Sequence, residues 1–96
     1  MRTEALSLAV SPMRADRGEQ TRYFLFCLRV EETAAYAVYV EGLGIGTLEL
    51  LGADLSDAED AYGRILAGEL SPVHLYEWVM DWRQESEKNA LLAERI

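Results

Sequence analysis

The residue types that most often carry chemistry are few in this sequence. His74 is the only histidine, and Cys27 is the only cysteine. General-base catalysis needs a second group that positions the base, and the sequence pattern places His74 in the first turn of a helix without such a group. A reactive thiolate needs an accessible, electropositive setting, whereas Cys27 falls in the middle of a predicted strand. We therefore predict no catalytic residue and a protein that is not an enzyme.

The acidic residues do not have the spacing of a metal site. A calcium loop needs a DxDxDG pattern, and this pattern is missing around the densest acidic stretch, residues 54–60. Helix capping and the helix dipole account for acidic residues at such a position. A lone cysteine also excludes a disulfide within the chain and a Cys-rich zinc site. The sequence thus predicts no metal ion and no cofactor.

The segment Gly42–Gly46 contains three glycines in five residues. A phosphate-binding loop also needs a helix N-terminus directly behind the glycines, and no helix is predicted there. A turn is the simpler interpretation. One alternative function stays open at this segment: a small-ligand-binding protein or an unrecognised enzyme, with a pocket between the turn and the start of the second predicted helix.

The charge distribution argues against nucleic acid and membranes as partners. The chain has 9 basic and 17 acidic residues, a net charge of −8. The excess lies in residues 41–96, whereas a phosphate backbone or an anionic lipid surface needs a basic patch. No apolar run approaches the ~20 residues that span a bilayer, and Met1–Glu4 does not begin a secretory signal. We expect a cytoplasmic protein.

The spacing of apolar residues changes near residue 52. Before it, the period of two residues predicts strands, and the even-numbered residues of each strand are expected to face the core. The long polar segment Ser11–Gln20 is predicted to be a loop. The four predicted strands are Glu4–Val10, Thr21–Val30, Ala35–Glu41 and Gly46–Leu51.

After residue 52 the period becomes helical. Ser56 and Glu59 form a predicted capping box for a helix over residues 57–67, and Ser71 precedes a second helix over residues 72–89. Leu75, Val79 and Trp82 are at the apolar centre of this second helix. The predicted fold is a single α+β domain over residues 1–96. It is a two-layer sandwich of a four-stranded antiparallel sheet with two C-terminal helices packed on one face.

The segment Leu66–Trp82 combines a Ser-Pro step, a leucine three residues later, an acidic residue and an Asp-Trp pair. It resembles the C-terminal signature of a family of short, uncharacterised proteins from clostridia-like Gram-positive bacteria, a domain of unknown function. In that family, strands also precede an acidic turn, a short helix and a second helix. The resemblance covers about residues 20–83. It implies a cytoplasmic protein with no assigned activity, and it transfers no catalytic residue.

The odd-numbered face of the predicted sheet is unusually apolar for a face that points away from the helices. Large apolar patches more often mark interfaces than bare surface. We therefore predict a non-enzymatic protein–protein interaction or self-associating module, with a dimer or another protein as its partner. An alternative is that the segment 11–20, or the chain after Asn89, covers this face. The predicted interface residues are Tyr23, Leu25, Cys27, Ala37, Tyr39, Leu91 and Leu92.

Overall fold

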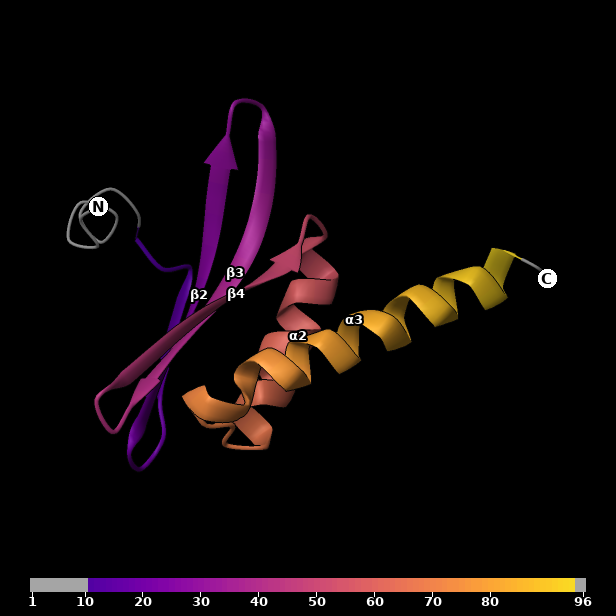
Figure 1. Ribbon diagram of the computed structural model, residues 1–96. Helices are drawn as coiled ribbons and strands as arrows, with labels where there is room; N and C mark the ends of the chain where they lie inside the picture. Colours follow the sequence, from indigo (N-terminus) through magenta and orange to yellow (C-terminus); the bar gives the residue numbers. More distant parts are fainter. Residues whose placement is uncertain (1–10, 95–96) are drawn as a thin grey trace.

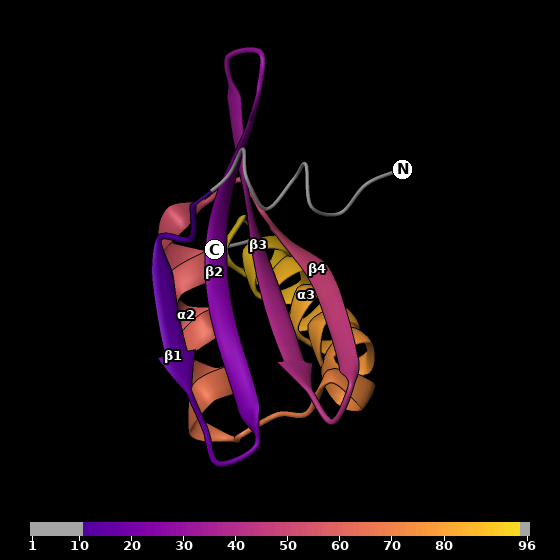
Figure 2. The same ribbon diagram turned by 90° about the vertical axis from the view of Figure 1, so that its left-hand side faces the viewer.

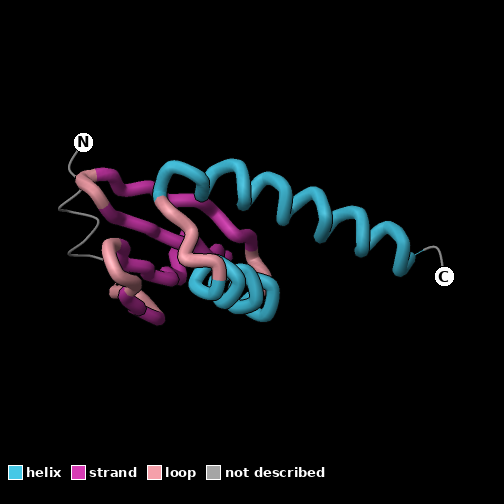
Figure 3. Tube along the Cα trace, turned by 90° about the horizontal axis from the view of Figure 1, so that it is seen from below, coloured by secondary structure: helices cyan, strands magenta, loops and turns pink. Residues whose placement is uncertain are grey.

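The computed structural model describes residues 11–94, which form four strands followed by two helices (Figure 1). The strands pair in chain order and are antiparallel throughout. Both helices pack on the same face of the sheet (Figure 3), which confirms the predicted fold class. The elements are β1 Arg14–Arg17, β2 Thr21–Val30, β3 Thr33–Gly42, β4 Ile45–Gly52, α2 Leu55–Ala67 and α3 Pro72–Glu94.

The strands from β2 onward lie where the sequence predicts them. β2 has the predicted bounds, and β3 and β4 are one to two residues longer at each end. The predicted strand Glu4–Val10 lies outside the described residues. The first strand of the sheet is β1, which falls inside the segment Ser11–Gln20 that was expected to be a loop. That prediction is wrong for Arg14–Arg17.

A contact from α2 holds the polar strand β1 on the sheet. The Tyr62 hydroxyl shares its proton between Asp16 Oδ2, at 2.8 Å, and the carbonyl oxygen of Tyr23, at 3.1 Å. The guanidinium of Arg14 lies over the Tyr62 ring, 5.0 Å from its centroid. Tertiary contacts of this kind override a low intrinsic preference for strand structure. The tyrosine therefore explains a strand that the hydrophobic pattern does not indicate.

Tyr62→Phe should lower the free energy of unfolding by about 1–3 kcal/mol, because two acceptors lose their donor. Burial, and then the acceptor Asp16, raise the pKa of Tyr62 above the ordinary tyrosine value of 10.0. The stabilisation by the neutral phenol is therefore complete below pH 10 and is lost as the pH rises toward the raised pKa. Urea unfolding at about pH 8 and about pH 11 measures this loss. The phenylalanine variant should lose less stability at high pH than the wild type, and an equal loss in both would contradict the assignment.

The two long hairpins determine which residues face the helices. Both close through two-residue turns, Glu31–Glu32 and Leu43–Gly44, so that Val30 pairs with Thr33 and the same spacing recurs at the second turn. Partners across such a turn are three residues apart. Residues on one face of the sheet therefore change from odd to even numbers at the first turn and back to odd numbers at the second. The prediction that even-numbered residues face the core in every strand is wrong for β2 and β4.

The core lies between the sheet and the two helices. In Figure 2, α2 runs behind β1 and β2, and α3 runs behind β3 and β4. The predicted apolar faces of both helices are confirmed, because their residues are buried against the inner face of the sheet. The buried core residues are Tyr23, Leu25, Val38, Val40 and Leu51 from the sheet, Ala58, Ala61, Tyr62 and Ile65 from α2, and Leu75, Val79 and Trp82 from α3.

Both helices are longer than predicted. α2 begins at Leu55, because the side chain of Asp54 is the N-cap: its Oδ1 accepts a hydrogen bond from the Asp57 amide at 2.9 Å. The predicted cap at Ser56 is therefore wrong. α3 continues past the predicted end at residue 89 to Glu94, and its C-terminal half projects beyond the sheet (Figures 1 and 3).

Asp54→Ala should lower the free energy of unfolding by about 0.5–2 kcal/mol, the usual cost of removing an N-cap side chain. Ser56→Ala is the matched control, because Ser56 is an exposed residue inside the first turn. It should change stability by less than about 0.5 kcal/mol. Urea unfolding of the two variants tests the assignment. A larger loss of stability for Ser56→Ala would show that Ser56 is the N-cap, as the sequence predicts.

Candidate interaction surface

An aromatic cluster lies on the face of the sheet that points away from the helices. Phe24 and Phe26 follow each other on this side of β2, with ring centroids 6.3 Å apart. Tyr39 is the cross-strand partner of Phe24, and their ring centroids are 6.1 Å apart. Aromatic pairs at this separation attract each other beyond their area of contact. We call this side of the sheet the outer face. Its apolar residues include Ala15, Phe24, Phe26, Leu28, Ala35, Ala37, Tyr39, Leu48 and Leu50.

The leucines of β4 extend the aromatic cluster toward the edge of the sheet. Leu48 pairs with Tyr39, and Leu50 pairs with Ala37. The sequence pattern assigned both leucines to the core, but Leu48 is 50% exposed and Leu50 is 48% exposed. The rings of β2 and β3 are half-buried by their neighbours. The apolar area in contact with solvent is thus greatest on the β4 side.

No helix in the described part of the chain covers the outer face. Figure 2 shows the sheet in front and both helices behind it. A sheet with helices on one side normally presents polar side chains on the other. Exposed apolar side chains that are contiguous and rimmed by polar residues often mark a binding surface. The outer face therefore has the composition of an interface.

One end of the outer face is polar and internally paired. Arg22 forms an ion pair with Glu41, and the Tyr39 hydroxyl donates a hydrogen bond to Glu41 Oε2 at 3.3 Å. Burial, followed by the negative charge of Glu41, raises the pKa of Tyr39. A Cβ at Gly46 would overlap the Tyr39 hydroxyl, so this glycine makes room for the ring. The apolar part of the face thus ends at a rim that carries both charges.

The predicted interface residues separate into two groups. Tyr23 and Leu25 are core residues, 2% and 0% exposed, so the prediction that they face outward is wrong. Cys27 pairs with Tyr36 on the same inner side, and its predicted outward orientation is also wrong. The cause is the change from odd to even numbering at the two-residue turn.

The structure describes the side chains of two of the four remaining predicted residues. Ala37 and Tyr39 lie on the outer face as expected, although Ala37 is fully buried among its neighbours. Leu91 and Leu92 belong to α3, but their side chains lie outside the described residues. The pattern missed Phe24, Phe26 and the leucines of β4. The signal that could have identified them is the length of the turns.

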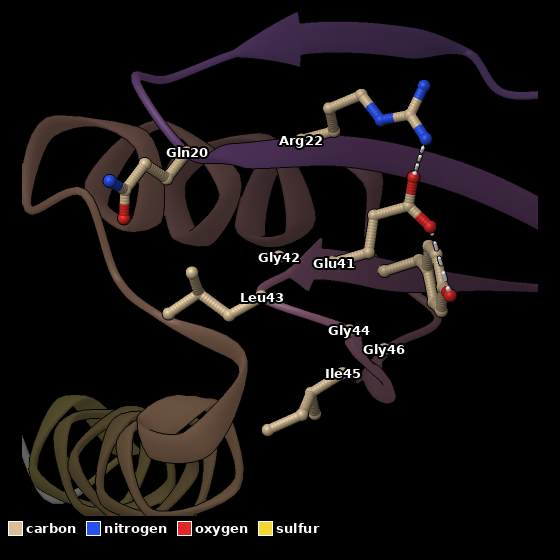
Figure 4. A pocket seen from close by; sticks show the side chains of 9 residues that line it. Gln20, Arg22, Glu41, Gly42, Leu43, Gly44, Ile45 and Gly46 are labelled. Atoms are coloured by element: carbon tan, nitrogen blue, oxygen red, sulfur yellow. Dashed lines mark hydrogen bonds and ion pairs between the residues drawn. The ribbon is translucent and has the colours of Figure 1, made fainter.

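A hollow of about 460 Å³ opens at the turn between β3 and β4 (Figure 4). Its charged groups, Arg22 and Glu41, are already paired with each other, and Leu43 and Ile45 project beside it. The described residues that line it come from the sheet, the β3–β4 turn and the β1–β2 connection, and they include neither His74 nor any other α3 residue. The pocket expected between the turn and the start of α3 is therefore not formed by these lining residues. The lining residues are Gln20, Arg22, Tyr39, Glu41 and Gly42–Gly46.

The groups considered for chemistry lie apart from one another. His74 is exposed in the first turn of α3, and Cys27 is half-buried on β2. Among the acidic residues, Asp54 caps α2, and Asp60 forms an ion pair with Arg64 at 3.1 Å. Within residues 11–94, no three His, Cys, Asp or Glu side chains that the structure describes gather as metal ligands would.

Comparisons with protein-family models, curated proteins and solved structures find no match to this chain. The resemblance to the family of short uncharacterised bacterial proteins therefore stays a prediction. No helix among the described residues has the length and apolar character needed to cross a membrane.

Proposed function

We propose that this protein is a non-enzymatic, cytoplasmic protein–protein interaction module that binds its partner through the outer face. The observation that carries the proposal is the aromatic cluster, extended by two half-exposed leucines, on the side of the sheet away from both helices. The partner would be a protein that presents an apolar surface of its own.

The composition of the outer face suits binding. Aromatic side chains are enriched in the centres of protein interfaces and contribute a large share of binding energy. Full burial of a leucine is worth about 1.5–3 kcal/mol, and Leu48 and Leu50 still have about half of their surface to bury. A partner that covers the outer face would thus gain binding free energy by burying side chains that the fold leaves in water.

A small-ligand pocket has less support. The hollow at the β3–β4 turn is open, and the charged groups that line it neutralise each other. A ligand there would have to break the ion pair between Arg22 and Glu41 before it could use either group. We therefore place the function on the outer face.

The size of the protein in its native cell extract tests this function. The wild type should elute above its monomer mass of 10.8 kDa in size exclusion, because its partner stays bound. The double variant Leu48→Lys/Leu50→Lys should elute as the monomer, since two ammonium groups would have to be desolvated in the contact.

The matched control is Val73→Lys/Tyr76→Lys, which adds the same charge at two exposed apolar residues of α3, 65% and 57% exposed. The control should elute with the wild type. An unchanged elution of Leu48→Lys/Leu50→Lys, with far-ultraviolet circular dichroism like that of the wild type, would overturn the proposed function.

A further inference from the structure

We infer that the partner is a second copy of this chain, and that the two sheets pack outer face against outer face with the helices outermost. This inference rests on the proposed function of the outer face and adds the identity of its partner. The arrangement is a two-fold sandwich in which the same surface is used by both copies.

The distribution of charge favours this arrangement for two acidic chains. Two copies with a net charge of −8 repel each other, and the repulsion falls as the charged groups move apart. Exposed acids such as Glu59, Glu77 and Asp81 lie on α2 and α3, behind the sheet. Contact through the outer faces would put these helices on opposite sides of the dimer, with the two sheets between them.

The rim of the outer face suits contact with itself. Arg22 and Glu41 present both charges at the same end of the face, and Arg17 lies beside Arg22 as its cross-strand partner. Because Arg22 and Glu41 neutralise each other within one copy, this pair adds no net charge where two identical patches meet. A wholly acidic or wholly basic rim would oppose such pairing.

The size of the sheet also fits. Four strands at ~4.8 Å spacing and about eight residues at ~3.3 Å rise give a footprint of roughly 19 by 26 Å, about 500 Å² in projection. Side-chain relief raises the accessible area above the projected area, toward the ~800 Å² per partner of a standard interface. Sheets that pack face to face lie ~10 Å apart with strands inclined by about 30°.

Pairing through the edges of the sheet is opposed by the residues at those edges. The β1 edge consists of four residues, of which Arg14, Asp16 and Arg17 are charged, and charged residues at an edge block strand addition. At the other edge, the guanidinium of Arg83 on α3 donates a hydrogen bond to the carbonyl oxygen of Leu50. Of the surfaces of the sheet, the outer face is therefore the one left for contact between copies.

Light scattering coupled to size exclusion of the purified full chain tests the inference. The wild type and Val73→Lys/Tyr76→Lys should have twice the monomer mass of 10.8 kDa. Leu48→Lys/Leu50→Lys should have the monomer mass. A purified wild type that is monomeric, together with a larger species in extract that depends on the outer face, would overturn the second copy as partner and leave the proposed function standing.

Three further outcomes decide between the surfaces. A monomer in both settings would remove the inference and the proposed function together. A dimer that survives Leu48→Lys/Leu50→Lys would place the contact elsewhere and overturn the inference. A monomer that dimerises when residues 1–10 are deleted would show that this segment of the same chain occupies the face, which also overturns it.

Cross-linking tests the orientation of the two copies. In a Cys27→Ser background, Leu50→Cys should give a covalent dimer with a bismaleimide of about 10 Å span, the spacing of packed sheets. Val73→Cys should give none, because α3 would be on the outside. Cross-linking of Val73→Cys but not of Leu50→Cys would contradict the sandwich.

Discussion

Trp82→Ala is expected to lower the free energy of unfolding by about 3–5 kcal/mol, which includes the cost of the cavity. Trp82 is 9% exposed and belongs to the core between α3 and the sheet. Its ring stacks on Trp78 with centroids 6.3 Å apart and an interplanar angle of 9°, so the substitution also removes an aromatic pair. A loss of this size is a large part of the total stability of a small domain.

Urea unfolding measures this effect, with Tyr76→Ala as the control from the same helix. Tyr76 is 57% exposed, so its truncation should cost less than about 0.5 kcal/mol. A loss below about 1 kcal/mol for Trp82→Ala, far under the range for large core truncations, would mean that α3 faces the sheet with a different side.

Leu25→Ala is the second large effect, with an expected loss of about 2–5 kcal/mol. Leu25 is 0% exposed on the inner side of β2, where it pairs with the buried Val38. The opposite orientation of β2 would make Leu25 a surface residue with a small effect. The experiment therefore tests which face of β2 forms the core.

Leu48→Ala is the matched control for this prediction, since it removes the same atoms from a leucine that is 50% exposed. It should lower the free energy of unfolding by about 1 kcal/mol, which is at most half of the smallest losses for buried leucines. Both variants are compared by urea unfolding at one protein concentration, low enough that the chain is monomeric. Equal losses in the two variants would contradict the assignment of the faces.

The elements of the fold could be predicted because their signals are local. Alternation indicates β2, β3 and β4, and the helical spacing of Ala58, Ala61 and Ile65 indicates the buried side of α2. The start of α3 at Pro72 follows from the preference of proline for the first helical position. These features depend on neighbouring residues alone, and the structure confirms them.

The orientation of the sheet could not be obtained from alternation alone, because both faces are apolar. Leu25 and Val38 on one face, and Phe26 and Leu50 on the other, give the same pattern of hydrophobicity. The additional information is the pairing across the turns, where Val30 meets Thr33. This register assigns each residue of the paired strands to one of the two faces. The helices then bury one of these faces, which becomes the core side.

The strand β1 depends on contacts that are distant in the sequence. Asp16 and Tyr62 are 46 residues apart, and neither residue carries a strand signal. The cap of α2 was missed for a different reason: Asp54 and Ser56 are both good capping residues, and the choice between them depends on where the backbone leaves β4.

The central claim is that another protein molecule covers the outer face. The rate at which a thiol reagent modifies Leu50→Cys in a Cys27→Ser background tests it directly, with Val73→Cys as the exposed reference. We predict that Leu50→Cys reacts much more slowly than Val73→Cys at high protein concentration, and that this protection is lost on dilution. Equal rates for the two thiols at every concentration, or a protection that dilution does not change, would contradict the claim.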